Sequence, residues 1–185
     1  TQPRAHNPLA VTATPERVAE LAGLVGPAGL LVIEDDHAGE ISSAPLATLG
    51  ARLPAHTVLI RSFSKSHGPD LRLAAVGGAA EPIARMVRRR MLGPGWSSRL
   101  LQAVLAELLV SASTADTMTA ARLAYAARRA GLVGALAEHG VTATGDDGIN
   151  VWVHVADERA AQVALAARGI GVAPGAPFMV GPGVQ

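Results

Sequence analysis

The chain has 185 residues, of which 49% are hydrophobic and 3% aromatic, and its formal net charge is +1. So small a net charge excludes the strong field with which a basic protein attracts nucleic acid or a membrane surface. The absence of cysteine excludes disulfides and thiolate metal sites. No signal peptide and no apolar run of membrane-spanning length is visible, so we expect a soluble, cytoplasmic protein.

The first half of the chain alternates between helices and short apolar strands. Thr14 and Pro15 begin a helix in "TPERVAELAGLVG", and Gly26-Pro27 ends it. "GLLVIEDD" is typical of a buried parallel strand, and further strands are expected in "HTVLIRSFSK" and "RLAAVGGA", before the helix "EPIARMVRRRM". This alternation predicts an α/β fold with a mostly parallel sheet.

The second half of the chain has a different pattern. "GPGWSS" precedes the helix "RLLQAVLAELLV", and a long Ala/Arg-rich helix is expected from about Thr114 to His139. "GVTATGDDGINVWVHV" predicts a hairpin of two strands, which the helix "DERAAQVALAARG" and a short strand "IGVAP" follow. We therefore expect a boundary near residue 112 and a chain that is cut at both ends.

The only lysine of the chain, Lys65, lies in "RSFSKSHGPDLR", whereas all other cationic side chains are arginines. Arginine stays charged at any biological pH, but a lysine can become neutral and nucleophilic. Ser62, Ser64 and Arg72 surround Lys65 with hydroxyl and guanidinium groups of the kind that bind phosphate. A nucleophilic lysine beside a phosphate pocket is what pyridoxal phosphate requires.

Pyridoxal phosphate also needs an acid at its ring nitrogen, because the protonated pyridine is the electron sink. "EDDH" follows the strand before the lysine, and ligands of parallel sheets bind at the carboxyl ends of strands. Asp35 or Asp36 can supply this acid. Taken singly, the lysine and the acids would by default be solvated turn residues. Their convergence on one cofactor favours the functional interpretation.

These residues resemble the signatures of the fold type I pyridoxal phosphate enzymes of aminotransferase class I/II. "HNPLA" is similar to the family's Asn-Pro-Thr-Gly segment, "IEDDH" to its acidic strand end and "SFSKSHGPDLR" to its Ser-x-Ser-Lys…Arg signature, in the family's order. "EDDHAGEI" and "GPGWSSRLLQ" are most similar to the aminotransferase-like domains of GntR/MocR-type bacterial regulators, in which a winged helix-turn-helix precedes the domain.

The resemblance implies a three-layer fold of the pyridoxal phosphate-dependent transferase type. Residues 1–111 would complete its large cofactor domain, and residues 112–185 would form a smaller α+β domain with a bridging helix, truncated at its end. The parent protein would be a homodimer, because the sites of this family are built at a subunit interface.

The resemblance also implies a role for each matching residue. Lys65 would form the Schiff base with pyridoxal 5'-phosphate and move a proton between the substrate's Cα and the cofactor, while Asp35 would pair with the pyridine nitrogen. The other cofactor-binding residues would be Asn7 and His37 at the phenolic oxygen, and Ser62, Ser64 and Arg72 at the phosphate.

Three features depart from the family pattern. Leu9-Ala10 replaces Thr-Gly, and His37 replaces a tyrosine, which would make the cofactor's electronics depend on pH. The glycine-rich phosphate loop and the aromatic residue that stacks on the ring would lie upstream of residue 1, and the arginine that binds the substrate carboxylate beyond Gln185. We therefore expect little or no transaminase activity from these 185 residues alone.

The implied function is transfer of amino groups from amino-acid-type substrates. The alternative is a GntR/MocR-type transcriptional regulator that senses an amino-acid or vitamin effector at the same site and reaches DNA only through an upstream domain. A third interpretation is a domain that has lost its cofactor, and Asp35, Lys65 and Arg72 together argue against it.

Two other kinds of site are less favoured. The six histidines contain no His-Glu-x-x-His pattern and no pair four residues apart, so we expect no metal site. The basic run "RMVRRRM" could contact DNA phosphates, but a solvated helix face is the simpler interpretation.

Overall fold

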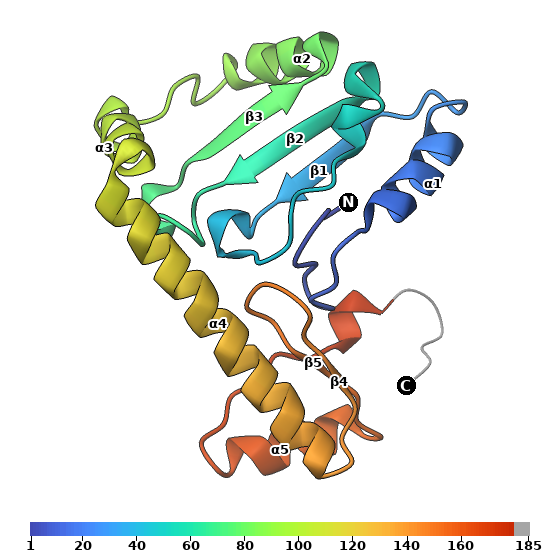
Figure 1. Cartoon of the computed structure of the whole chain (residues 1–185). Coiled ribbons are helices and arrows are strands. Elements are labelled where there is room, and N and C mark those ends of the chain that lie inside the picture. Colours follow the sequence, from blue (N-terminus) through green and yellow to red (C-terminus); the bar gives the residue numbers. More distant parts are fainter. Residues whose placement is uncertain (180–185) are drawn as a thin grey trace.

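The computed structural model of the chain describes residues 1–179 and shows two units that one long helix joins (Figure 1). The first unit is a three-stranded sheet with three helices around it, and the second contains a two-stranded hairpin and one helix. The elements are α1 (Pro15–Val25), β1 (Val32–Asp36), β2 (Thr57–Ser62), β3 (Ala74–Gly78), α2 (Ala80–Arg90), α3 (Arg99–Val110), α4 (Ala112–Glu138), β4 (Ala143–Thr144), β5 (Trp152–Val153) and α5 (Glu158–Ala166).

The strands of the first sheet lie in the order β1-β2-β3. β1 and β2 are parallel, with Asp36 opposite Arg61, whereas β2 and β3 are antiparallel, with Ser62 opposite Ala74. The structure thus differs from the expected mostly parallel sheet at the third strand. The chain between β2 and β3 is too short for the crossover that a parallel strand needs, so it reverses.

Burial along β1 alternates as in any strand, but the acids lie on the buried face. Glu34 and Asp36 are 1% and 0% exposed, whereas Ile33 is 52% exposed. The expectation that the apolar run is buried is therefore wrong for Ile33. Hydrogen bonds compensate the buried charge of Glu34, because its carboxylate accepts from the backbone nitrogen of Leu49 at 2.8 Å and from the Thr48 hydroxyl.

The first helix begins and ends at the residues that the sequence predicts. The Thr14 hydroxyl accepts a hydrogen bond from the first turn of α1, Pro15 occupies that turn, and Gly26 follows the last residue. Ser111 ends α3 and caps α4, which begins at Ala112, two residues before the predicted start. Among the described residues, no helix is both long and apolar enough to cross a membrane.

The second unit contains the predicted hairpin and helix. β4 and β5 are antiparallel, with Thr144 opposite Trp152, and the Asp157 carboxylate caps α5. The predicted strand "IGVAP" is wrong, because residues 170–174 have no regular structure. A strand requires a partner, and in the described part of the chain β4 and β5 pair only with each other.

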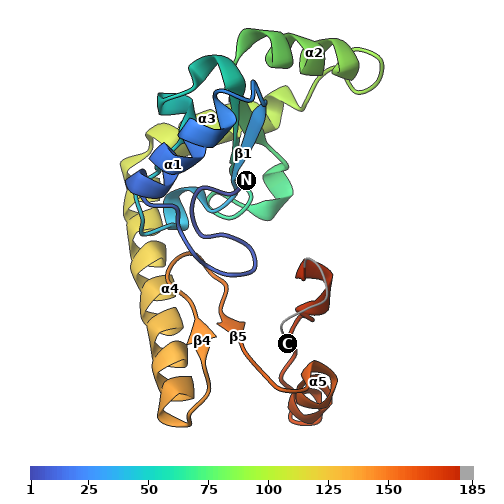
Figure 2. The same ribbon diagram turned by 90° about the vertical axis from the view of Figure 1, so that its right-hand side faces the viewer.

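The tip of the hairpin packs against the loops of the first unit (Figure 2). The buried carboxylate of Asp147 accepts hydrogen bonds from the backbone nitrogen of Ser43 at 2.7 Å, from the Thr12 hydroxyl at 3.2 Å and from the Ser42 hydroxyl. Burial raises the pKa of the Asp147 carboxyl, but these hydrogen bonds outweigh burial and hold the pKa below its usual range.

Arg129 on α4 supports this tip from the other side. Its guanidinium donates to the backbone carbonyls of Gly145, of Asp146 at 3.1 Å and of Gly148. Gly148 has a φ of +71°, and a Cβ at this position would lie 2.6 Å from the Cβ of Ala5. The close approach of the two units therefore requires glycine there.

Asp147→Ala is expected to lower the free energy of unfolding by about 3 kcal/mol, because it leaves one buried and two partly buried donors without an acceptor. Asp146→Ala is the matched control: its exposed carboxylate is expected to contribute within about 0.5 kcal/mol. Urea unfolding of the two variants measures the difference, and equal losses would contradict the role given to Asp147.

Candidate functional site

All the predicted cofactor residues except Asn7 lie at or next to the strand ends on one edge of the first sheet, where β1 and β2 end and β3 begins (Figure 1). Asp35 and Ser62 lie at the ends of neighbouring parallel strands, and Lys65 lies in the turn after β2. Because β3 is antiparallel, the same turn brings Arg72 back to this edge, two residues before Ala74.

The turn after β2 is anchored by Phe63 and leaves Lys65 exposed. Phe63 is buried, and its ring contacts the ring of His67 edge-on. The backbone nitrogen of Ser64 donates to the Ser62 hydroxyl at 3.3 Å. The Lys65 amine forms no hydrogen bond or ion pair with any residue in 1–179, so nothing in that part of the chain competes with a ligand for it.

Arg72 has a left-handed backbone, with φ +50° and ψ +40°, directly after the short helical turn Pro69–Leu71. For a residue other than glycine this conformation costs about 1–2 kcal/mol. Its side chain is exposed, and within the described residues it pairs with no carboxylate. Backbone strain of this kind is concentrated at ligand-binding sites.

The two acids that end β1 have different surroundings. Arg4 donates to both oxygens of Asp36, at 2.8 and 2.9 Å, and Arg61 pairs with the same carboxylate. Burial raises the pKa of the Asp36 carboxyl, but the two guanidinium groups outweigh burial and hold the pKa below its usual range. Among residues 1–179, the only side chain that donates to Asp35 is Gln2, at 3.4 Å. Asp35 is therefore the acid that remains available to a ligand.

Sequence reasoning missed the charged network behind this edge. Arg61 pairs with both Asp36 and Glu40, and Arg4 also donates to the carbonyl of Ala44 at 3.0 Å. Opposite charges at the ends of adjacent strands could have indicated the Asp36–Arg61 pair. No pattern could have indicated Arg4, which lies in a loop 32 residues before Asp36.

Asn7 lies in a tight loop before α1. Backbone hydrogen bonds join His6 to Ala10 at 2.6 Å and to Val11 at 2.9 Å. Ala10, which replaces the family's glycine, is fully buried and has a φ of +57°, so the loop keeps a glycine-like conformation. The side chain of Asn7 is exposed, and its Oδ1 accepts from the amide of Asn150 at 3.0 Å.

His6 and His37 are neighbours beside the Asn7 loop and the end of β1. The Nδ1 atom of each is buried and has no hydrogen-bond partner in the described part of the chain. Burial, followed by the charge of His37, lowers the pKa of His6 from its usual 6.5. Protonation of His6 is therefore coupled to folding.

Acidification from about pH 7.5 to about pH 5.5 is expected to destabilise the wild type more than His6→Gln. Because the folded pKa of His6 is lowered, the unfolded chain binds a proton below pH 6.5 that the folded chain takes up only at lower pH. Stability therefore falls as the pH falls through this range. Urea unfolding at the two pH values tests this, with the exposed His154→Gln as the control for losing one imidazole. The same loss in wild type and His6→Gln would contradict it.

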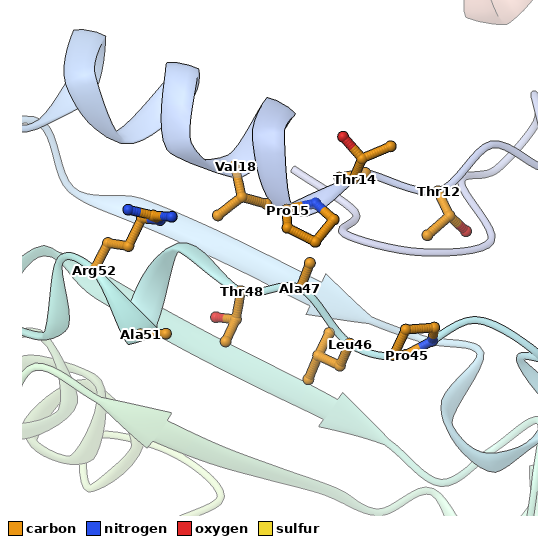
Figure 3. A pocket seen from close by; sticks show the side chains of 11 residues that line it. Thr12, Thr14, Pro15, Val18, Pro45, Leu46, Ala47, Thr48, Ala51 and Arg52 are labelled. Carbon is orange, nitrogen blue, oxygen red and sulfur yellow. The ribbon is translucent and has the colours of Figure 1, made fainter.

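Two cavities lie near the loops of the first unit. One, of about 520 Å³, lies between the start of α1 and residues 45–52, and its lining includes Val18 and Leu46 but none of the predicted cofactor residues (Figure 3). The other, of about 900 Å³, opens between the Asn7 loop, at His6 and Pro8, and the second unit, at Trp152. Only the second cavity borders the loop of a predicted cofactor residue.

Known proteins share both the sequence pattern and the fold of this chain. A family model described as aminotransferase class I and II matches residues 3–184. The vitamin B6 salvage pathway transcriptional repressor PtsJ of Salmonella typhimurium is 37% identical over 152 residues, which are 82% of this chain and 35% of PtsJ.

Three solved aminotransferases have the same fold. Thermus thermophilus aspartate aminotransferase with maleate has a TM-score of 0.88 at 22% identity, over 96% of this chain and 48% of its own. The aromatic aminotransferase from Pyrococcus horikoshii has a TM-score of 0.88 at 21% identity, over 97% and 51%. LysN, the α-aminoadipate aminotransferase of Thermus thermophilus, has a TM-score of 0.84 at 23% identity, over 96% and 49%.

The expected fold type and cofactor class are confirmed. The solved structures have fold type I, and the matched family depends on pyridoxal phosphate. The chain spans 35% of PtsJ and about half of the solved structures. Since the family model matches residues 3–184, the chain belongs to the aminotransferase class I and II family.

Proposed function

We propose that the whole protein binds pyridoxal 5'-phosphate at this sheet edge and transfers amino groups of amino-acid-type substrates. The observation that carries the proposal is the only lysine of the chain, Lys65, which is exposed and unpaired within residues 1–179, at the edge where Asp35 ends β1. We also propose a cytoplasmic homodimer, with residues 1–111 in the large domain and 112–185 in the small one.

The residues at this edge fit pyridoxal phosphate. The buried Nδ1 of His37 has no partner among the described residues, and a buried polar atom of this kind is normally hydrogen-bonded. A phenolic oxygen of the ligand would provide that partner. The exposed guanidinium of Arg72 and the hydroxyls of Ser62 and Ser64 supply donors suited to a phosphate.

When bound, pyridoxal phosphate supplies an aldehyde carbon that takes up an amine and a ring that accepts the electrons of a bond broken at the substrate's Cα. Asp35 would keep the ring nitrogen protonated, because a carboxylate favours the charged form of a neighbouring base. The Lys65 amine would accept the Cα proton and later return it. Asn7 and His37 would donate to the phenolic oxygen.

A single-turnover experiment with the whole protein tests the proposal. The protein loaded with pyridoxal phosphate is mixed with a panel of L-amino acids, and the 2-oxo acid that forms is quantified. The proposal predicts one equivalent of oxo acid from at least one amino acid, together with a change in the cofactor's visible absorbance. A folded, loaded protein that yields no oxo acid would contradict amino transfer.

A transcriptional regulator is the second candidate, and the 37% identity to the repressor PtsJ favours it. The same edge would then bind an amino-acid or vitamin effector, and contact with DNA would come from another domain. With a regulator, binding of the effector is expected to change the visible absorbance of the cofactor, but no 2-oxo acid is expected to form. The fraction of DNA fragments from its own promoter region that the whole protein binds would change when the effector is added.

A further inference from the structure

The first residues of the chain run alongside β1 and bring Gln2 next to Asp35. The Thr1 nitrogen donates to the carbonyl of Ile33 at 2.7 Å, and the Thr1 carbonyl accepts from the backbone nitrogen of Asp35 at 2.9 Å. This pair of hydrogen bonds fixes Thr1 beside the strand. Gln2, the next residue, is half-buried and is held close to the acid.

Both the oxygen and the nitrogen of the Gln2 side-chain amide form hydrogen bonds. Its Oε1 accepts from the backbone nitrogen of Asn7 at 2.7 Å, and its Nε2 donates to Oδ2 of Asp35 at 3.4 Å. A backbone N–H can only donate, so the atom that faces Asn7 must be the oxygen. The amide nitrogen therefore has to face Asp35, and the orientation of the side chain is fixed by chemistry.

We propose that Gln2 is a positioning residue of the cofactor site, which links the Asp35 carboxylate to the loop that carries Asn7. The donor on Oδ2 holds the Asp35 carboxylate in place and would leave Oδ1 for the ring nitrogen of the cofactor. Within residues 1–179 no cation pairs with Asp35, since Arg4 and Arg61 both bind Asp36. This inference rests on the proposed binding of pyridoxal phosphate.

Two variants distinguish the hydrogen bond that Gln2 donates to Asp35 from the one that it accepts from Asn7. Gln2→Met has a similar length and removes both hydrogen bonds. Gln2→Glu keeps an acceptor for the Asn7 backbone but removes the donor to Asp35, so Oδ2 of Asp35 is no longer held in place. Gln102→Met and Gln102→Glu, on the exposed side of α3, are the matched controls.

The measurement is the dissociation constant of the whole protein for pyridoxal phosphate and for its analogue in which carbon replaces the ring nitrogen. The analogue has no group for Asp35 to bind. We expect the wild type and the Gln102 variants to bind pyridoxal phosphate more tightly than the analogue. In both Gln2 variants the ratio of the two dissociation constants is expected to be about fivefold smaller, as the loss of one hydrogen bond implies.

Each other outcome overturns a separate claim. Equal weakening of both ligands in the Gln2 variants would mean that Gln2 only supports the fold, and an unchanged preference would mean that it does not act on Asp35. Either result overturns the role of Gln2 while the proposed function stands. A folded wild type that binds neither ligand would overturn the proposed function itself.

Discussion

Lys65→Arg in the whole protein is expected to abolish covalent capture of pyridoxal phosphate and to lower amino transfer by about a thousandfold or more. Arginine keeps the positive charge but does not become a neutral nucleophile at biological pH. Lys65 is exposed and its side chain forms no hydrogen bond or ion pair within residues 1–179, so stability is expected to stay the same. Visible absorbance of the cofactor and single-turnover oxo-acid yield measure the two effects.

Moving the lysine provides the control for this experiment. The double variant Lys65→Arg with Arg85→Lys keeps both the net charge and the number of lysines, but places the amine on the exposed surface of α2. It is expected to behave like Lys65→Arg alone. Capture of the cofactor by a folded Lys65→Arg protein would remove Lys65 from the proposed chemistry.

Asp36→Ala is expected to lower the free energy of unfolding by about 3–5 kcal/mol, because it leaves the buried Arg4 without a counter-charge and leaves Arg61 with Glu40 alone. The carboxylate is fully buried between Arg4 and Arg61. Because the pKa of Asp36 is lowered, its contribution is present above the usual value of 3.8 and is lost as the pH falls through the lower folded value. Urea unfolding of the cofactor-free protein measures the effect.

The neighbouring acid gives the matched comparison. Asp35→Ala is expected to change the free energy of unfolding by less than about 1 kcal/mol, since its one side-chain hydrogen bond is long, at 3.4 Å. Its effect is expected in the affinity for pyridoxal phosphate instead. Similar losses of stability in the two variants would contradict the assignment of Asp36 to the fold and of Asp35 to the ligand.

The sequence predicts those features of the fold that depend on neighbouring residues. The start of α1 at Thr14 and Pro15, its stop at Gly26 and the hairpin around residues 146–148 all follow from local backbone and side-chain preferences, and the structure confirms them. The family could also be predicted from the sequence, because its signature around Lys65 is contiguous in the chain.

Features that depend on contacts between distant residues were not predictable. Burial of Glu34 and Asp36 requires donors from Leu49 and Arg4, which no pattern in the strand reveals. The predicted strand "IGVAP" lacks a partner among residues 1–179. The direction of β3 is a different case, because it follows from the short chain before it and could have been predicted from the sequence. The roles of the predicted site residues stay predictions, because they concern a ligand and not the chain alone.

The most direct test of the account is borohydride reduction of the whole protein with pyridoxal phosphate, followed by peptide mass analysis. Lys65 is the only lysine in these 185 residues, so a tag on this part of the protein has a single expected position. The account predicts that the tag is on Lys65. A folded protein that carries no tag, or carries it outside this chain, would contradict the proposed cofactor site.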